Sequence, residues 1–326
     1  MIRALLTAAL CAGCILHGIN PAQSQASFPN KPIKLVVPFP PGGSVDVLAR
    51  VISDRLGTVL GQSIVVENHG GGAGGSNGAK MVAAADPDGY TILITPGGAL
   101  TSGPAVYKNI GYDPAKVFAP VGLLVETPQI ISVNPGLPAK SLAEVVTYAK
   151  ANPGKISWGT QGFGTSPHLL LELFKLEAGI NIVHVPYRGT APMLAAAAAG
   201  EVQMVGDPMT SSLPLIQSGR LRPLAIAGTE RSSQLPDVPT TTEAGYPKLN
   251  APFWLGVVAP AGTPSPIIDK LNASLRETLA PPQTRERLAT LSAEVKIGSP
   301  QDFSKMLAQE LALWTSVVKA ANITVE

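Results

Sequence analysis

Cysteine and histidine are scarce in this chain of 326 residues. Both cysteines, Cys11 and Cys14, lie near the amino terminus. A mature chain without that region would keep no thiol, which excludes disulfides, thiolate nucleophiles and cysteine metal sites. The histidines beyond it, His69, His168 and His184, have no ligand-like neighbour at helical or hairpin spacing. We therefore expect neither a metal site nor a cofactor.

Charge is also sparse, and it is nearly balanced. Charged residues make up 14% of the chain, with 24 lysines and arginines against 22 aspartates and glutamates. Loss of Arg3 with the amino-terminal region would leave 23 against 22, a net charge of +1. This balance gives no electrostatic basis for binding nucleic acid or an anionic membrane, so small molecules are the favoured ligands.

The apolar run near the amino terminus is too short to span a bilayer as a helix. It extends from Ala4 to Leu16, and Ser24-Gln25-Ala26 then places small residues at the positions that a signal peptidase reads. We expect residues 1–26 to be a signal peptide and the mature protein to be exported. A lipoprotein anchored through Cys14 is the less favoured alternative, because Cys11 is an unusual residue three places before the acceptor.

The stretch from Ile33 to Arg50 reads as a strand, a tight loop and the start of a helix. The apolar run Ile33–Val37 is followed by three prolines, which cannot donate to a sheet, and by Gly42 and Gly43. Ser44 is expected to cap a helix that ends near Gly61. Free N–H groups and the helix dipole would then face the ligand, which favours an anion such as a carboxylate or phosphate.

Strands alternate with helices after this unit, which predicts an α/β fold with mostly parallel sheets. Further strands are expected at residues 64–67 and 90–95. The loops Pro38 to Gly43 and Pro96 to Gly98 should share the carboxyl edge of one sheet, where ligands bind in open α/β sheets.

A second lobe is expected to begin where apolar stretches between Val121 and Val133 are interrupted by Thr127-Pro128. There the strand–loop–helix design recurs, with a strand at 155–159, a glycine-bearing loop and a helix capped by Ser166. The apolar run 253–259 would return to the first lobe. We therefore predict one lobe from residues 27–125 plus 251–326 and another from residues 126–250.

Three polar residues of the second lobe could meet a ligand. His168, at the start of a helix, could donate to an anion or could pack under the loop before it. Asp207 follows a strand expected at 202–205, so it would face the cleft and accept a hydrogen bond. Arg188, beside Tyr187, is either a charge on the rim, which we favour, or a partner for a carboxylate.

Two short patterns in the glycine-rich segment have little weight. Gly70, Gly72 and Gly75 match a dinucleotide-binding pattern, but no acidic residue ends the next strand. Gly74-x-Ser76-x-Gly78 matches a hydrolase nucleophile pattern, but no histidine follows Asp207 in the order that this fold requires. We do not expect an enzyme, and a periplasmic α/β hydrolase is kept only as an alternative.

Several motifs together resemble the Bug-type solute-binding receptors of tripartite tricarboxylate transporters. The segments that carry the resemblance are Pro38 to Asp46, Val65 to Asn68, Pro87 to Thr91, Phe118 to Val121, Ala151 to Lys155, Ser166 to Leu169, His184 to Gly189, Ser218 to Arg222 and Leu235 to Thr240. They follow the family's order and cover nearly the whole mature chain.

This resemblance implies a two-lobed, Venus-flytrap binding protein of the periplasm. As a monomer, it would close on a small carboxylate and deliver it to the membrane components of a tripartite tricarboxylate-type transporter. A sensor for a membrane kinase is an alternative that sequence does not separate from it. The expected ligand-binding residues are Phe39, Pro41, Gly42, Gly43, Ser44, Asp46, Gly97, Gly98, Thr165, Ser166, His168, Tyr187 and Asp207.

The chain departs from the family pattern at two places. His69 to Gly72 lacks the usual proline, which should loosen that loop. Gly206 stands where the family tends to have a large apolar or aromatic residue. From this we predict a roomier pocket that would accept a bulkier or aromatic carboxylate.

Overall fold

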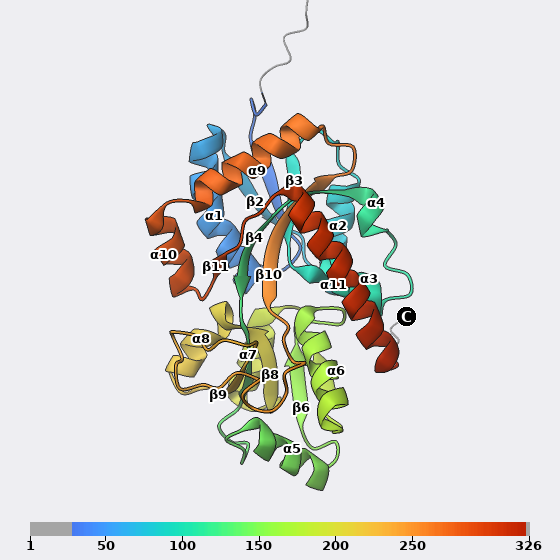
Figure 1. Ribbon diagram of the computed structural model, residues 1–326, viewed down its shortest axis with the longest axis vertical. Coiled ribbons are helices and arrows are strands. Elements are labelled where there is room, and N and C mark those ends of the chain that lie inside the picture. The colour runs from blue at the N-terminus through green and yellow to red at the C-terminus, as the bar shows by residue number, and fades with distance from the viewer. Residues whose placement is uncertain (1–27, 324–326) are drawn as a thin grey trace, which may run out of the picture.

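The computed structural model describes residues 28–323, which form two sheets, each flanked by helices (Figure 1). The predicted signal peptide, with Cys11 and Cys14, lies outside the described residues. Within 28–323, no helix combines the length and the apolar character needed to cross a membrane.

The first sheet has six strands in the order β11-β4-β10-β3-β1-β2. They are β1 (Ile33–Val37), β2 (Ile64–Asn68), β3 (Thr91–Thr95), β4 (Phe118–Thr127), β10 (Phe253–Pro260) and β11 (Glu294–Val295). β1 is parallel to β2 and β3, whereas β10 is antiparallel to β3 and β4, and β11 is antiparallel to β4. The strands β1 to β4 therefore share one direction, and β10 and β11 oppose them.

The second sheet has five strands in the order β7-β6-β8-β5-β9. They are β5 (Gln129–Val133), β6 (Ser157–Thr160), β7 (Val183–Pro186), β8 (Met204–Pro208) and β9 (Arg222–Ala227). β6 is parallel to β7 and β8, and β5 is antiparallel to β8 and β9. Each sheet is thus mixed, with most strands in one direction, and the predicted α/β fold class is confirmed.

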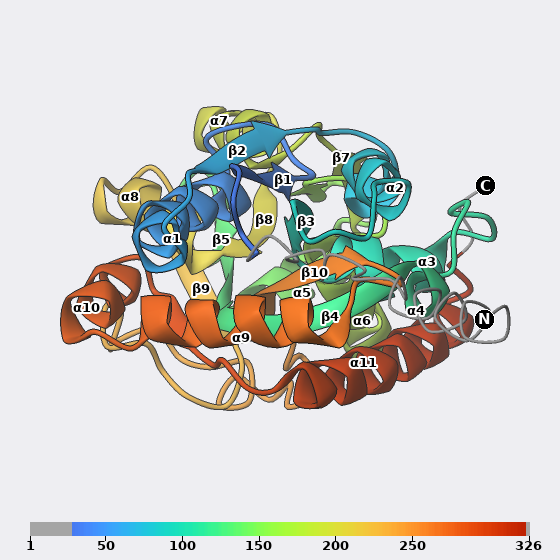
Figure 2. The same ribbon diagram turned by 90° about the horizontal axis from the view of Figure 1, so that it is seen from above.

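Helices cover both faces of both sheets (Figures 1 and 2). Around the first sheet lie α1 (Ser44–Leu60), η1 (Ala73–Gly75), α2 (Ser76–Ala83), η2 (Gly98–Ser102), α3 (Gly103–Val106), α4 (Pro114–Val117), α9 (Ser265–Leu279), α10 (Pro282–Thr290) and α11 (Pro300–Ala320). Around the second lie α5 (Leu142–Ala151), α6 (Ser166–Ala178), α7 (Thr190–Ala199) and α8 (Met209–Gln217).

Alternation along the strands sorts side chains between the two faces of a sheet. In β1, Leu35 and Val37 join the apolar core beneath α1 and α9, while Val36 joins the core beneath α2 and α11. The second sheet repeats this arrangement, since Ile131 packs with α5 and α6, and Ile130 packs with α7 and α8. Each sheet therefore has two buried faces, which explains why its strands read as continuous apolar runs.

The chain crosses between the sheets in two places. β4 ends at Thr127 in the first sheet, and β5 begins at Gln129 in the second. The return runs from β9 to β10, over residues 228–252. The predicted boundaries at 125/126 and 250/251 lie beside these crossings, so the division into lobes stays a prediction that the topology supports.

Helix α11 touches both halves of the molecule. Phe303, near its start, packs in the core of the first sheet, whereas Trp314 and Val317 pack in the core of the second. Figure 1 shows α11 running from beside β4 toward α6. The carboxyl-terminal helix therefore bridges the two lobes.

Candidate functional site

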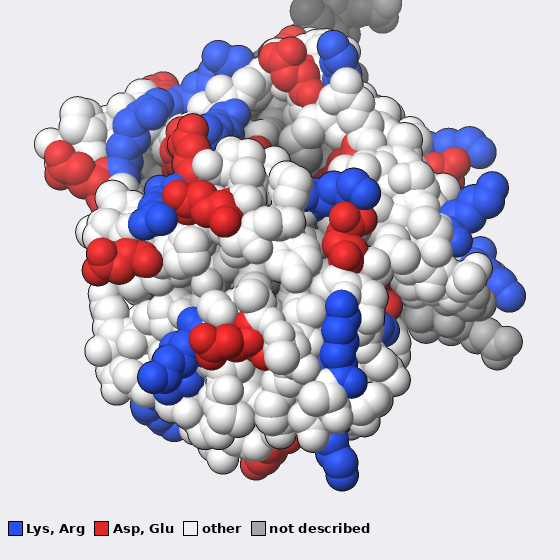
Figure 3. All heavy atoms as spheres, turned by 60° about the horizontal axis from the view of Figure 1, so that its bottom comes forward, with Lys and Arg blue, Asp and Glu red and all other residues white. Residues whose placement is uncertain are grey.

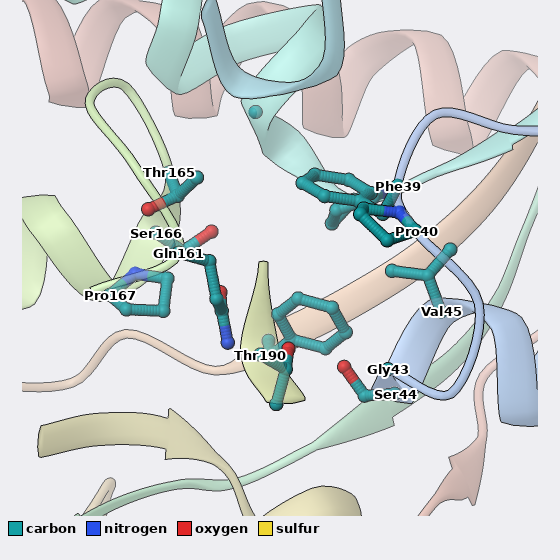
Figure 4. Close-up of a pocket in the computed structure, with 13 residues that line it drawn as sticks. Phe39, Pro40, Gly43, Ser44, Val45, Gln161, Thr165, Ser166, Pro167 and Thr190 are labelled. Atoms are coloured by element: carbon teal, nitrogen blue, oxygen red, sulfur yellow. The ribbon is translucent and has the colours of Figure 1, made fainter. Parts of the chain in front are cut away.

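A pocket lies between the two lobes, at the carboxyl ends of their parallel strands (Figure 4). It encloses about 420 Å³, its open mouth included. The lining residues are Phe39, Pro40, Gly43, Ser44, Val45, Pro96, Gly98, Gln161, Thr165, Ser166, Pro167, Thr190 and Phe253. We call this the interlobe pocket. Within residues 28–323, no lysine, arginine, histidine, aspartate or glutamate lines it.

Three helices begin at the interlobe pocket. α1 and α6 start with Ser44 and Ser166, and α7 starts with Thr190. In each case the preceding residue, Gly43, Thr165 or Gly189, makes no side-chain cap hydrogen bond. The first N–H groups of a helix have no partner inside it, so three sets of backbone donors and three positive dipole ends surround one cavity.

The prediction that the two serines cap their helices is wrong. Gly43 and Thr165 hold the extended cap conformation, and each serine is the first residue of its helix. As a result, neither hydroxyl folds back onto its own backbone. In the described part of the chain, Ser44 Oγ and Ser166 Oγ make no hydrogen bond, although both residues are buried. Figure 4 shows the Ser44 hydroxyl directed toward the middle of the pocket.

The loop after β1 is held in place by Asp46 and Asn68. Asp46 Oδ2 accepts from the Gly42 N–H at 3.0 Å, and Asn68 Nδ2 donates to Asp46 Oδ1 and to Phe39 O, both at 3.0 Å. Burial favours a higher pKa for Asp46, but hydrogen bonds from Arg50, Gly42 and Asn68 outweigh burial and lower it. Asp46 is therefore a charged residue that shapes the loop and does not line the pocket.

Asp207 lies behind the pocket and reaches it through Gln161. β8 extends to Pro208, so Asp207 sits within the strand, opposite Ile130, and is fully buried. Its predicted place beyond the strand, facing the cleft, is wrong. Gln161 Nε2 donates to Asp207 Oδ1, and Ser211 Oγ donates to Oδ2. Burial penalises the charged carboxylate and raises the pKa of Asp207 to about 8, despite these donors.

Replacing Asp207 with asparagine should make stability less dependent on pH. The pKa of about 8 lies above the ordinary 3.8, so the folded state keeps a proton that the unfolded chain releases. The free energy of unfolding therefore falls as pH rises through this window. The asparagine amide oxygen can still accept from Gln161, its amide nitrogen can donate to the Ser211 hydroxyl, and the amide does not titrate. Urea denaturation measures the free energy of unfolding of both proteins. The value for the variant minus that for wild type should rise by about 2 kcal/mol or more between about pH 5 and about pH 8.

If the two proteins differed in free energy of unfolding by the same amount at about pH 5 and at about pH 8, the prediction would be wrong. That result would mean that Asp207 is already ionised in the folded state at about pH 5.

His168 packs under the loop that carries Gln161 and Thr165. Its Nδ1 accepts from the Gly164 N–H at 3.3 Å, and its ring stacks on His184 with centroids 4.5 Å apart. Burial lowers the pKa of His168 to about 3. Of the two roles left open for His168, the structure shows packing under the loop, and the neutral ring supports the loop from behind.

The lobes touch on either side of the interlobe pocket. A Cβ added at Gly43 would lie 3.4 Å from Thr190 Oγ1, and one added at Gly189 would lie 3.4 Å from Pro40. Ser102 Oγ also donates across the lobes to Gly164 O at 2.7 Å. The lobes are therefore close together on both sides of the interlobe pocket.

The structure gathers six predicted site residues at the interlobe pocket: Phe39, Gly43, Ser44, Gly98, Thr165 and Ser166. Pro41 and Tyr187 line an adjoining pocket. Gly42, Asp46, Gly97, His168 and Asp207 line neither. Contact of any of them with a ligand stays a prediction.

Seven lining residues lie outside the predicted set of ligand-binding residues: Pro40, Val45, Pro96, Gln161, Pro167, Thr190 and Phe253. Thr190 follows a strand and Gly189, so the pattern that identifies the first two helix starts could have identified this third one. Gln161 lies in a loop whose glycines are its visible feature. Pro96 belongs to the loop that the sequence places at this edge of the sheet, whereas Phe253 reaches the pocket through tertiary folding and no local signal marks it.

The expected extra room at Gly206 is absent. A Cβ at this position would lie 2.7 Å from Trp158 Cζ2 and 3.3 Å from Leu170 Cδ2. The fully buried Trp158 ring fills the space that a larger residue would need. The prediction of a roomier pocket from Gly206 is therefore wrong, because this glycine faces the core of the lobe.

Known proteins share this architecture over nearly the whole chain. BugT of Bordetella pertussis is 37% identical over 303 residues, which cover 93% of each chain. A solved protein of R. palustris with adipate has a TM-score of 0.88 and 39% identity, covering 91% of this chain and 99% of that one. MatC from Rhodopseudomonas palustris with bound malate has a TM-score of 0.85 and 34% identity, covering 89% and 100%.

A family model described as "Tripartite tricarboxylate transporter family receptor" matches residues 48–323. This range includes the starts of α6 and α7, the bridging helix α11 and both sheet crossings. The resemblance noted in the sequence is thus confirmed, and the chain belongs to the tripartite tricarboxylate transporter receptor family.

Proposed function

We propose that this protein is an exported receptor that closes its two lobes on a small carboxylate. The observation that carries the proposal is the meeting of three helix starts, α1, α6 and α7, at one pocket without charged lining residues. Backbone N–H groups and helix dipoles can stabilise an anion without a full counter-charge. The free hydroxyls of Ser44 and Ser166 can add hydrogen bonds to the same group.

The protonation state of Asp207 supports an anionic ligand. With a pKa of about 8, its carboxyl group holds a proton at neutral pH, so it adds no full negative charge behind Gln161. An ionised carboxylate there would repel a bound anion through a short stretch of protein of low dielectric. The pocket therefore keeps a positive potential that comes from the backbone.

Relatives bind ligands of this class. The two solved relatives described above carry adipate and malate, which are both dicarboxylates. We propose that the ligand of this chain has at least one carboxylate, held by the starts of α1 and α6.

We infer that the receptor acts in the periplasm by capture and release, without turnover, as a monomer that meets membrane components of a transporter. Solved relatives are described as periplasmic proteins. The face shown in Figure 3 carries acidic and basic side chains interspersed, with no large area of one sign. Such a surface favours a soluble monomer and brief encounters with a partner over permanent attachment.

Binding can be tested with the purified mature protein by thermal shift and calorimetry, using adipate, malate and hexanoate alongside the diamide of adipate. Ligands that bind only the folded state raise the melting temperature by mass action. We expect at least one carboxylate to raise it and the uncharged diamide to leave it unchanged. Equal shifts in melting temperature with adipate and its diamide would exclude recognition of the carboxylate. If no acid shifted the melting temperature, the proposed function would be wrong.

A further inference from the structure

A group of hydrogen bonds joins the two lobes outside the interlobe pocket. Two residues of the second lobe, Thr210 in α8 and Gln234 in the returning segment 228–252, reach one turn of the first lobe, residues 289–292, where α10 ends. Figures 1 and 2 show α8 and α10 on the same side of the molecule. We call these two residues and this turn the hinge clasp.

Thr210 is the buried part of the hinge clasp. Its Oγ1 donates to Leu291 O at 2.7 Å and accepts from Thr127 Oγ1 at 3.4 Å. Thr127 is the last residue of β4, just before the crossing, and both threonines are buried. The Met209 N–H, at the start of α8, donates to Pro128 O in the crossing at 3.0 Å. The start of α8 is therefore fixed to the crossing and, through one hydroxyl, to the first lobe.

Gln234 makes two further hydrogen bonds to the same turn. Its Nε2 donates to Ala289 O, and its Oε1 accepts from Ser292 Oγ at 3.0 Å. The turn is itself held by backbone bonds from the Ser292 N–H to Ala289 O and from the Ala293 N–H to Leu288 O, both at 2.9 Å. Because the turn is held in this way, a movement of the second lobe away from it breaks the bonds of the clasp.

The hinge clasp lies apart from the interlobe pocket. Gln234, Ala289 and Ser292 line another cavity, and none of the described residues lines both that cavity and the interlobe pocket. Pro252 lines the cavity at the clasp, whereas the next residue, Phe253, lines the interlobe pocket, so the return crossing separates the two. The clasp can therefore affect ligand binding only through the arrangement of the lobes.

The clasp is formed in the same arrangement in which the lobes meet around the interlobe pocket. Within residues 28–323, no ion pair joins one lobe to the other, so hydrogen bonds between neutral groups carry the polar contacts. A hydroxyl–carbonyl bond of 2.7 Å is lost when its atoms move about 1 Å further apart. Rotation of the lobes about the crossings therefore breaks the clasp, which stabilises the closed arrangement relative to an open one.

We propose that the hinge clasp holds the lobes closed and that Thr210 is a positioning residue, which raises ligand affinity without touching the ligand. This inference rests on the proposed function, because it concerns a receptor whose lobes close on a ligand. The apparent affinity of such a receptor falls with the fraction of molecules in the arrangement that binds. The loss of one net hydrogen bond changes that equilibrium about fivefold.

The test uses two substitutions at Thr210. Thr210→Val keeps the branched shape and removes the hydroxyl, whereas Thr210→Ser keeps the hydroxyl. Calorimetry with adipate, malate and hexanoate should show Thr210→Val binding about fivefold more weakly, and by the same factor for each acid that the wild-type protein binds, because closure is common to all. Thr210→Ser should bind as wild type does.

The matched control is Thr278→Val. It removes a buried hydroxyl that also donates over 2.7 Å, in this case to Ser274 O within α9 of the first lobe. Because this bond does not join the lobes, the variant should bind every acid as wild type does. Thermal melts of all variants without ligand identify a temperature at which each is fully folded.

The outcomes separate the two proposals. If carboxylates bind but Thr210→Val keeps the wild-type affinity, or if Thr278→Val loses as much, the clasp is wrong and the receptor function stands. A loss that differs between acids would mean that Thr210 contacts the ligand, and a loss shared by Thr210→Ser would mean that packing is responsible. Either result also contradicts the clasp. If no carboxylate binds the wild-type protein, both proposals fall.

Discussion

Replacing Ser44 with aspartate is expected to weaken carboxylate binding at least about 100-fold while leaving the protein folded. Ser44 is the first residue of α1, it is buried, and its hydroxyl points into the interlobe pocket (Figure 4). A carboxylate placed there would take the position of the ligand at the helix start. Two like charges at about 4 Å repel each other by about 4 kcal/mol at an effective dielectric of about 20.

The same substitution should not lower stability. An acidic residue in the first turn of a helix is favourable by about 0.3–1 kcal/mol, because it meets the positive end of the dipole and free N–H groups. We therefore expect the ligand-free Ser44→Asp protein to melt at or slightly above the wild-type temperature. Loss of function without loss of stability would identify the helix start as the place where the ligand's charge is held.

Ser44→Asn is the matched control, because asparagine has nearly the same size as aspartate without its charge. It should lose no more than about tenfold in affinity, since it displaces the hydroxyl but does not repel the anion. Calorimetry with the tightest carboxylate measures both variants. Equal losses in the two would show that crowding, and not charge, controls binding at α1, and would argue against the electrostatic account.

The parts of this site that sequence predicts are those with local causes. Three prolines end β1 after Val37, and Gly61, with φ of +67°, ends α1 as expected from its tolerance of left-handed backbone. The loops after β1 and β3 share one edge of the sheet because their strands are parallel neighbours. The fold class can be predicted from the alternation of strands and helices. The family can be predicted because its motifs occur along the chain in the family's order.

The parts that sequence does not predict depend on contacts between distant segments. The residue pattern places Asp207 in a loop, but pairing with β5 extends β8 past it and buries it. Gly206 suggests space in the pocket, but Trp158, 48 positions earlier in the chain, fills that space. The serine caps fail for a different reason, since a glycine or threonine just before them already has the cap geometry. The general preference for serine at the N-cap does not show whether the serine itself or the residue before it is the cap.

A second large effect is expected where the bridging helix α11 meets the loop after β3. Glu310 of α11 is partly buried, and burial raises its pKa. Trp254 Nε1 donates to Glu310 Oε1 at 2.8 Å, and Thr101 Oγ1 donates to Oε2 at 2.6 Å. Thr101 lies in η2, which begins at Gly98 of the interlobe pocket. One carboxyl group thus ties the bridging helix to the central strand β10 and to a pocket loop.

Glu310→Ala should destabilise the protein by roughly 2–4 kcal/mol, because it leaves the Trp254 indole without its acceptor, leaves the Thr101 hydroxyl only its longer bond to Gly97 O at 3.1 Å, and opens a small cavity. Glu310→Gln should lower the free energy of unfolding much less, since its amide oxygen can still accept a hydrogen bond and its side chain resembles the protonated acid. Urea denaturation gives the free energies of unfolding. Gln309→Ala, at an exposed position on the same helix, controls for the change in helix propensity and should lie within about 0.5 kcal/mol of wild type.

Ligand affinity should follow the same order as stability, because η2 sets the position of Gly98 at the pocket. Calorimetry with the tightest carboxylate should show weaker binding for Glu310→Ala than for Glu310→Gln, even at a temperature where both are fully folded. If Glu310→Ala were destabilised but bound the ligand as well as wild type, Glu310 would hold the helix without shaping the pocket. Weaker binding in Glu310→Ala would instead mean that a helix bridging both lobes transmits its packing to the site, which is what a receptor that closes on its ligand requires.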